Sequence, residues 1–251
     1  APAENSSARR VPSPWAMGRM AAEAEKKGYA VTNPIPAPPG DARLIDLTIP
    51  EAVTWWQDAM IPRIKEGVLG FKLDRGEEKV PDGKLFSGYY SDGTSYREGH
   101  NAYPMWYARA VNGAYQRAGA EEFAVMPRSG WAGSQRYAIF WGGDTWGSSY
   151  GLRSAIIAVQ RSAAMNFPIW GSDTCGYDPM APREVCARWL AFSAFTPLME
   201  VGPTGNYSLW SMPPEGVEGQ VTEDGYDYEP AYDEELLAIW IFYARLHNDL
   251  S

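Results

Sequence analysis

The chain has 251 residues, 45% of them hydrophobic, which permits one large domain or two small ones. Its 22 basic and 31 acidic residues give a net charge of −9, and no run of Lys and Arg is long enough to follow phosphates, so nucleic acid and anionic membrane surfaces are excluded as partners. The chain has two cysteines and two histidines, which are too few for a disulfide framework, a four-sulfur zinc site or a His-rich metal centre. No metal or cofactor is expected.

The first part of the chain is predicted to contain two helices and one strand. Residues 15–28 show helical spacing that stops at a glycine, and a second helix is expected over 48–66, with Pro50 near its first turn. The apolar run 67–73 has little polar alternation, as expected of a strand covered on both faces. This strand stops abruptly on a carboxylate, Asp74, which calls for a functional explanation.

The rest of the chain is predicted to alternate regularly between strands and helices. A long loop rich in Gly, Asp, Ser and Tyr is expected over 75–103. The elements expected after it are a helix over 104–119, strands ending at Arg128 and Asp144, a helix over 150–165, a strand ending at Asp173, a helix over 183–194, a strand over 196–202, a long loop over 203–230 and a helix over 232–249. Such alternation implies parallel strands covered by helices.

The charged strand ends distinguish the two α/β folds that fit this alternation, a doubly wound sheet and a (β/α)8 TIM barrel. Asp74, Arg128, Asp144 and Asp173 each stand at the C-terminal end of a strand, where a barrel builds its active site. A doubly wound sheet concentrates its ligand crevice at one switch point, and no GxGxxG or P-loop pattern follows any strand. The barrel is therefore favoured.

The number of strands falls short of a closed barrel. About five are found, where a barrel has about eight. We expect residues 1–251 to form a single partial barrel, about strands 4–8, with the loops 75–103 and 203–230 at its active-site face. An open half-barrel would expose two strand edges and apolar surface.

Two strand-end carboxylates indicate a possible chemistry. Asp74 and Asp144 are 70 residues apart, which is two βα units of about 30 to 35 residues each. Two carboxylates that face one pocket are the minimal equipment of a glycosidase. Among 31 acidic residues many pairs have this separation, and strand-end carboxylates that cap turns are the alternative interpretation.

Four stretches carry a more specific signal. They read GFKLDRGEE, HNAYPMWYARA, RSGWAGSQRYAIFWGGD and FPIWGSDTCGY. In this order they resemble the catalytic barrel of glycoside hydrolase family 31, from about Trp15 to the end of the chain. The resemblance implies a retaining α-glycoside hydrolase that acts on α-linked glucosides or xylosides by double displacement. A transglycosylase of the same family and a catalytically incompetent fragment are the alternatives.

The resemblance also implies roles for individual residues. Asp74 would be the nucleophile, Glu77 the second carboxylate of its motif, and Asp144 the general acid/base. The residues implied to bind the sugar or to border its pocket are Arg128, Trp141, Asp173, Tyr177 and Trp170. For Asp173 an alternative is that its carboxylate holds Arg128 in place.

Simple electrostatics agrees with these roles. A nearby arginine such as Arg128 would keep Asp74 ionised. Apolar surroundings such as Trp141 and Trp146 would keep Asp144 protonated, as a general acid requires.

The sequence departs from the family pattern in two places. The region LMEVGPTGN lacks the histidine of the Arg-x-His that many members carry on the last strand, and Arg75 replaces a smaller or apolar neighbour of the nucleophile. The identity of the α-linked sugar therefore stays open, as do the oligomeric state and the compartment. Cys175 and Cys186 are expected to be free thiols.

Overall fold

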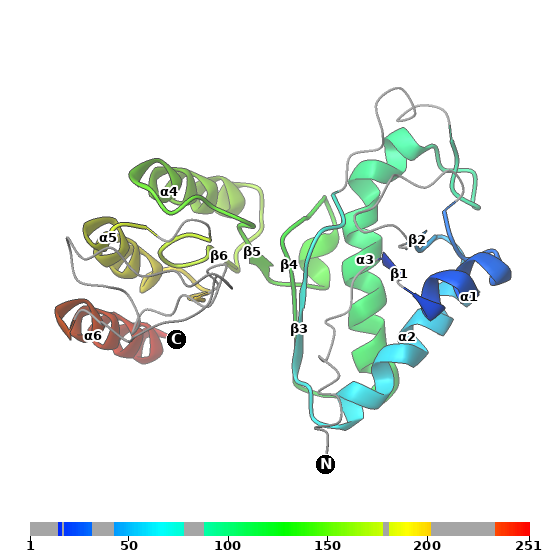
Figure 1. Ribbon diagram of the computed structural model, residues 1–251, viewed down its shortest axis with the longest axis horizontal. Coiled ribbons are helices and arrows are strands. Elements are labelled where there is room, and N and C mark those ends of the chain that lie inside the picture. The colour runs from blue at the N-terminus through cyan, green and yellow to red at the C-terminus, as the bar shows by residue number, and fades with distance from the viewer. Residues whose placement is uncertain (1–14, 17, 32–42, 78–87, 178–180, 202–233) are drawn as a thin grey trace, which may run out of the picture. The chain divides into compact units, whose positions relative to one another are not determined.

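The computed structural model describes residues 15–16, 18–31, 43–77, 88–177, 181–201 and 234–251 (Figure 1). The chain divides into two compact units, the first unit Ala1–Ile139 and the second unit Phe140–Ser251. No helix within the described ranges is long and apolar enough to cross a membrane.

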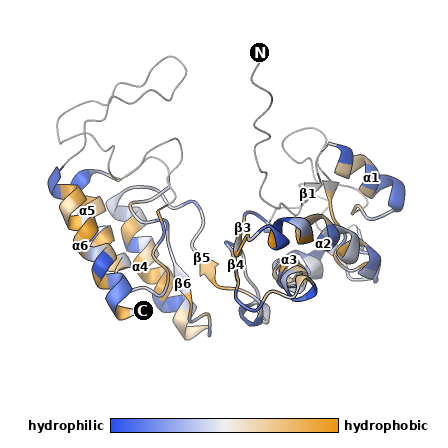
Figure 2. Ribbon diagram, turned by 90° about the horizontal axis from the view of Figure 1, so that it is seen from below, coloured by the Kyte–Doolittle hydropathy of each residue, from blue (hydrophilic) through white to orange (hydrophobic). Residues whose placement is uncertain are grey.

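The first unit contains a pair of parallel strands with two helices beside it. Its elements are β1 (Trp15–Ala16), α1 (Arg19–Lys27), β2 (Arg43–Leu44), α2 (Pro50–Lys65), β3 (Gly70–Leu73), α3 (Tyr96–Ala118), β4 (Ala124–Pro127) and the 3₁₀ helix η1 (Ser134–Arg136). The β3 and β4 strands run parallel, and β1 and β2 form a short antiparallel pair. The α3 helix packs against β4 and against α2, and it lies between them in both ribbon views (Figures 1 and 2).

One buried apolar cluster stabilises this arrangement. It takes side chains from α1, α2, α3 and the strands, and Leu73, the last residue of β3, is fully buried in it. On α3, Tyr107, Val111 and Tyr115 recur at a spacing of four residues, so they line one face of the helix and pack inward. Burial of this face positions α3 beneath the ends of β3 and β4.

The α3 helix begins earlier than predicted. The helix expected over 104–119 starts at Tyr96, because Ser95 and Glu98 form a capping box. The backbone N–H of Glu98 donates to Ser95 Oγ at 3.3 Å, and Ser95 Oγ donates to the Glu98 carboxylate at 2.7 Å. The end of the expected loop 75–103 is therefore helical, with Pro104 inside the helix, and residues 78–87 lie outside the described ranges.

The second unit continues the alternation of helices and parallel strands. Its elements are β5 (Phe140–Trp141), α4 (Ser149–Ala164), β6 (Trp170–Gly171), α5 (Arg183–Ser193) and α6 (Glu234–Leu250). The β5 and β6 strands are parallel, and a parallel bridge joins Asp173 to Glu200, within the strand expected over 196–202. The α5 helix lies between α4 and α6 (Figure 1). The expected loop 203–230 lies outside the described residues.

The predicted alternation of helices with parallel strands is therefore confirmed. Over the described ranges the strands form three two-stranded pairs, two of them parallel, and no closed barrel.

The prediction that Cys175 and Cys186 are free thiols is wrong, because the two form a disulfide. Cys175 has a φ of 72° in the turn that follows β6, and its Cα lies 4.5 Å from that of Cys186 on α5. Both cysteines are fully buried. Two cysteines alone carry no signal of pairing, and only the fold of this turn against α5 brings them together.

Candidate active site

Asp74 directly follows β3 and presents an exposed carboxylate. Its side chain is 60% exposed, and its Oδ1 lies 2.9 Å from Nη1 of Arg128. The same oxygen accepts a hydrogen bond from the backbone N–H of Arg75 at 2.9 Å. Two donors therefore face one oxygen and fix the orientation of the carboxylate.

Arg128 joins Asp74 to Glu77. The register of the parallel pair sets Leu73 opposite Pro127, so the residues after β3 and after β4 emerge at the same end. Nε of Arg128 donates to Oε1 of Glu77 at 2.7 Å, and Nη2 lies 2.5 Å from the same oxygen. The Arg128 side chain is only 21% exposed, so the fork is held in a partly desolvated position. The structure thus brings together three predicted site residues.

The turn between Asp74 and Glu77 has a strained backbone with a specific support. Arg75 has a φ of 66°, which is uncommon for a residue with a side chain. The Ser129 hydroxyl donates to the backbone carbonyl of Arg75 at 2.9 Å. The adjacent Gly76 has a φ of 97°, and a Cβ there would come within 3.1 Å of Ser129 Oγ and 3.2 Å of Tyr107 Cδ1. Glycine is therefore required at this turn, whose position is fixed by β4 and α3.

Ser129 is a residue of the site that the sequence interpretation missed. It is buried next to Arg128 and supports the turn after β3. Ser129 and Arg75 are 54 residues apart, so the sequence does not indicate their contact. The one signal for Ser129 in the sequence is its place beside Arg128 in the stretch PRSG.

In the second unit the predicted site residues follow β5 and β6. Asp144 is exposed three residues after β5, and Asp173 is fully buried two residues after β6. Trp141 and Trp170 are buried in the strands themselves, and Tyr177 is half-buried. The structure thus places all five at the strand ends or in the strands of one parallel pair.

The apolar shielding expected for Asp144 is absent from the described part of the second unit. Asp144 is exposed there, and Trp146 is 69% exposed. Trp141 is buried and belongs to β5, where it pairs with Gly171 of β6. The position of Trp146 therefore requires an explanation other than shielding of the Asp144 carboxyl group.

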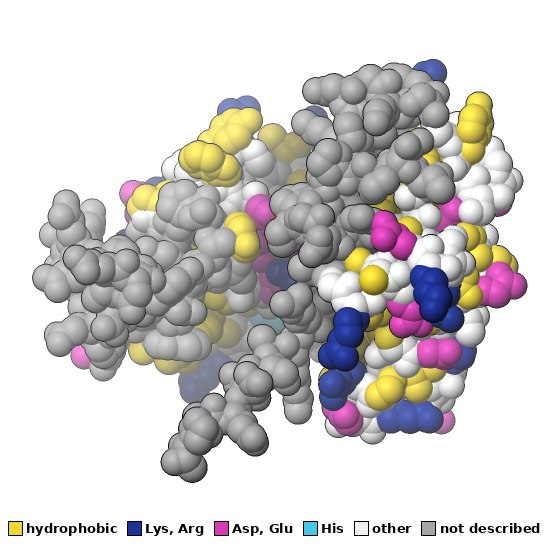
Figure 3. All heavy atoms as spheres, turned by 45° about the vertical axis from the view of Figure 1, so that its right-hand side comes forward, with side chains coloured by type: hydrophobic (Ala, Val, Ile, Leu, Met, Phe, Trp, Pro, Cys, Tyr) yellow, Lys and Arg dark blue, Asp and Glu magenta, His cyan; other side chains and the backbone are white. Residues whose placement is uncertain are grey.

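The surface around the first unit carries charges of both signs. In Figure 3 dark blue and magenta side chains alternate on the visible face, and the described residues on it form no continuous basic patch. Across the described ranges no group of three or more His, Cys, Asp and Glu side chains could hold a metal ion.

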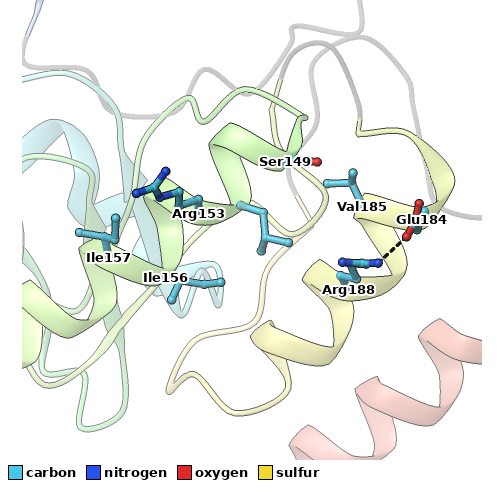
Figure 4. A pocket seen from close by; sticks show the side chains of 8 residues that line it. Ser149, Arg153, Ile156, Ile157, Glu184, Val185 and Arg188 are labelled. Atoms are coloured by element: carbon cyan, nitrogen blue, oxygen red, sulfur yellow. Dashed lines mark hydrogen bonds and ion pairs between the residues drawn. The ribbon is translucent and has the colours of Figure 1, made fainter.

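A pocket of the second unit is lined by residues of two helices. It has a volume of about 370 Å³ and lies between α4 and α5 (Figure 4). Its walls combine the aliphatic Ile156, Ile157 and Val185 with the Glu184–Arg188 ion pair. It contains none of the predicted site residues, so we do not assign sugar binding to it.

Comparisons with known proteins agree with the sequence pattern. Residues 11–219 match the glycosyl hydrolases family 31 TIM-barrel domain. The chain is 33% identical over 161 residues to the 1,3-alpha-isomaltosidase of Kribbella flavida, covering 63% of this chain and 22% of that protein. It is 27% identical over 213 residues to the lysosomal alpha-glucosidase of Rattus norvegicus, covering 70% of this chain and 22% of that protein. The chain thus spans less than a quarter of the length of these relatives.

A solved structure is similar over nearly the whole chain. The cycloalternan-degrading enzyme from Trueperella pyogenes, in complex with a covalent intermediate, matches with a TM-score of 0.75 and 26% identity, covering 95% of this chain and 34% of that one. Another structure of that enzyme contains isomaltose.

Proposed function

Because the chain belongs to glycosyl hydrolase family 31, we propose that it carries the catalytic residues of a retaining α-glycosidase. Residues 11–219 are part of the family's TIM-barrel domain, and we assign its strands to about strands 4–8 of that barrel. We propose α-linked glucosides or xylosides as the substrates of this glycosidase. The observation that carries the proposal is the exposed Asp74 carboxylate, held with Glu77 by the Arg128 fork at the carboxyl end of a parallel strand pair.

In the proposed mechanism Asp74 is the nucleophile. Its ion pair with Arg128 orients the carboxylate, and its exposure leaves the carboxylate accessible to a sugar. Attack on the anomeric carbon would form a bond from the carboxylate to that carbon and break the bond to the glycosidic oxygen. Glu77 would act as a positioning residue, because it holds Nε and Nη2 of Arg128 and so leaves Nη1 for Asp74.

Asp144 is the proposed general acid/base. It would protonate the departing glycosidic oxygen in the first step and take a proton from water in the second. Water would then attack the same anomeric carbon and release Asp74. Two inversions give net retention, so the first product of an α-glycoside is the α-anomer.

The remaining predicted residues are proposed to shape the sugar site. Arg128 and the half-buried Tyr177 have polar groups that suit sugar hydroxyls, and we propose the same for the carboxylate of Asp173. Trp141 and Trp170 are buried, so we propose that they form its wall. The printed names of the relatives, an isomaltosidase and an α-glucosidase, support an α-linked sugar as the substrate.

The test is hydrolysis of aryl α-glucoside and aryl α-xyloside with NMR detection of the first anomer formed. We expect the α-anomer, and we expect Asp74→Ala and Asp144→Ala each to abolish the reaction. Asp58→Ala is the matched control, because Asp58 is also an exposed aspartate of the first unit in an ion pair with an arginine, Arg117. A β-anomer as the first product, or hydrolysis that survives either active-site substitution, would overturn the proposal.

Azide distinguishes the two roles. In Asp144→Ala, azide can attack the glycosyl-enzyme in place of water, and we expect an α-glycosyl azide. In Asp74→Ala, azide can only replace the nucleophile, which gives a β-glycosyl azide. Exchanged configurations would reverse the assignments of the two carboxylates.

A further inference from the structure

Beside Asp144 the chain makes a turn that presents a large apolar side chain to solvent. Trp146 is 69% exposed, whereas Trp141, Trp170 and Trp189 of the same unit are buried. An exposed indole forgoes the stabilisation that burial of a large aromatic side chain provides. The exposure of Trp146 two residues from the proposed acid/base therefore calls for a ligand that the indole contacts.

The backbone of this turn is held by hydrogen bonds on both sides of the indole. The carbonyl of Thr145 accepts from the backbone N–H of Tyr177 at 2.6 Å, and the carbonyl of Trp146 accepts from that of Ser148 at 2.9 Å. The first bond ties the turn to the segment that follows β6. The second closes the turn just before α4 begins.

Close packing restricts the same turn further. A Cβ on Gly151, in the first turn of α4, would collide with the carbonyl oxygen of Trp146. A Cβ on Gly176 would collide with the backbone of Gly147. Two glycines are therefore required where α4 and the segment after β6 approach the turn, and the Cα of Trp146 has a fixed position although its side chain is exposed.

We propose that Trp146 is the stacking platform for the sugar that leaves in the first step, a deepening that rests on the proposed function. A general acid gives its proton to the oxygen of the departing group, so Asp144 must face the leaving-group side of the bond. Trp146 belongs to the same fixed turn and therefore lies on that side. The C–H face of a pyranose is apolar and matches the face of an indole, which offers a large rigid contact area at a low entropic cost.

The proposal predicts a selective loss in Trp146 variants. The probes are isomaltose, whose leaving group is a sugar, and α-glucosyl fluoride, whose leaving group is a single atom. In Trp146→Ala, kcat/KM for isomaltose should fall about three- to tenfold relative to kcat/KM for the fluoride, as expected for the loss of one aromatic contact. Trp146→Phe should retain part of the preference.

Phe195→Ala is the matched control, because Phe195 is 70% exposed in the same unit and lies away from Asp144 in sequence. It should leave the ratio of the two kcat/KM values unchanged. An equal loss on both substrates in Trp146→Ala would show a purely structural role, and an unchanged ratio would show that no leaving-group sugar contacts the indole. Either result overturns the proposal.

A binding measurement separates this proposal from the proposed function. In saturation-transfer NMR of Asp74→Ala with isomaltose, the reducing-end ring should receive saturation, and this transfer should disappear when Trp146→Ala is added. If the unaltered chain hydrolyses neither substrate, the proposed function fails while the NMR result still decides on the platform. Equal transfer to the reducing-end ring with and without Trp146 would overturn the proposal that Trp146 is the stacking platform.

Discussion

Replacing Arg128 by lysine tests whether the fork at the end of β4 positions the nucleophile. Arg128 uses three nitrogens for two carboxylates: Nη1 for Asp74 at 2.9 Å, and Nη2 and Nε for Glu77 at 2.5 and 2.7 Å. Lysine keeps the positive charge and carries a single nitrogen. Its compact ammonium can contact both carboxylates, but it cannot present the planar fork that fixes their present geometry.

The structure predicts a small effect on stability and a large one on activity. Asp74 is 60% exposed, so solvent screening limits its pair with Arg128 to about 0.2–1 kcal/mol. The two-nitrogen contact with Glu77 adds about 1 kcal/mol by the same reasoning. We therefore expect Arg128→Lys to lower the free energy of unfolding by about 1–2 kcal/mol. A nucleophile displaced by about 1 Å should lower kcat/KM by about 100-fold.

The two effects are measured by urea denaturation and by hydrolysis of an aryl α-glucoside. Arg117→Lys is the control, because Arg117 pairs with Asp58 at 2.7 Å on the surface of the same unit. It should cost a similar or smaller free energy of unfolding and leave kcat/KM unchanged. If Arg128→Lys retains kcat/KM within about threefold, or loses activity only in proportion to the unfolded fraction, the fork does not position Asp74.

Three further predictions concern the framework around the site. The hydroxyl of Tyr115 is buried with no hydrogen-bond partner among the described residues, and burial raises the pKa of Tyr115 to about 12. Tyr115→Phe should therefore keep or raise the free energy of unfolding, by up to about 1 kcal/mol, and a clear loss in urea denaturation would show a missed partner. Hydrogen bonds from Ser95 lower the pKa of Glu98 in the folded state. The stabilisation that Glu98 provides is therefore complete above its unfolded-state pKa and is lost as the pH falls through its folded-state pKa. Thermal melts of Glu98→Gln and of the unaltered chain should differ near neutral pH and converge once the pH is below the folded-state pKa of Glu98, whereas a difference that persists in strong acid would contradict the capping box. The Cys175–Cys186 disulfide closes a loop of 11 residues, so its reduction should cost about 2–3 kcal/mol in urea denaturation, and titratable thiols before reduction would contradict the bond.

Local signals in the sequence predicted most of the elements. The glycine that ends α1, Pro50 at the start of α2 and the apolar run before Asp74 act within a few residues, and they set the end of α1, the start of α2 and the end of β3. The predicted helix start at residue 15 is wrong, because Trp15–Ala16 form β1 and α1 begins at Arg19. The predicted start of α3 at residue 104 is wrong, because the capping box of Ser95 and Glu98 begins the helix at Tyr96 and Pro104 lies inside it.

Contacts between distant residues set the limit of the sequence interpretation. The charged strand ends predict Asp74 and Arg128 as site residues, and the resemblance to family 31 implies Glu77. The clustering of the three follows from the parallel register of β3 and β4. The hydrogen bond from Ser129 to Arg75 depends on a turn with a positive φ, which no spacing rule indicates.

In the second unit the sequence also left the exposure of side chains undetermined. Trp141, Trp146 and Trp170 are chemically identical, yet two are buried and one is exposed. The two strand residues are part of the packed interior, whereas the residue in the turn before α4 is not, and only the fold distinguishes them.

The most direct test of the proposed mechanism is to trap the glycosyl-enzyme and locate the label. Incubation with 5-fluoro-α-glucosyl fluoride should slow the second step, and mass spectrometry of the digested protein should find one added fluoroglucosyl group on the peptide that contains residues 73–78. We expect fragmentation to place the group on Asp74. A label on Glu77, on Asp144 or on another residue, or turnover of an aryl α-glucoside without any trapped intermediate, would contradict the assignment of Asp74 as the nucleophile.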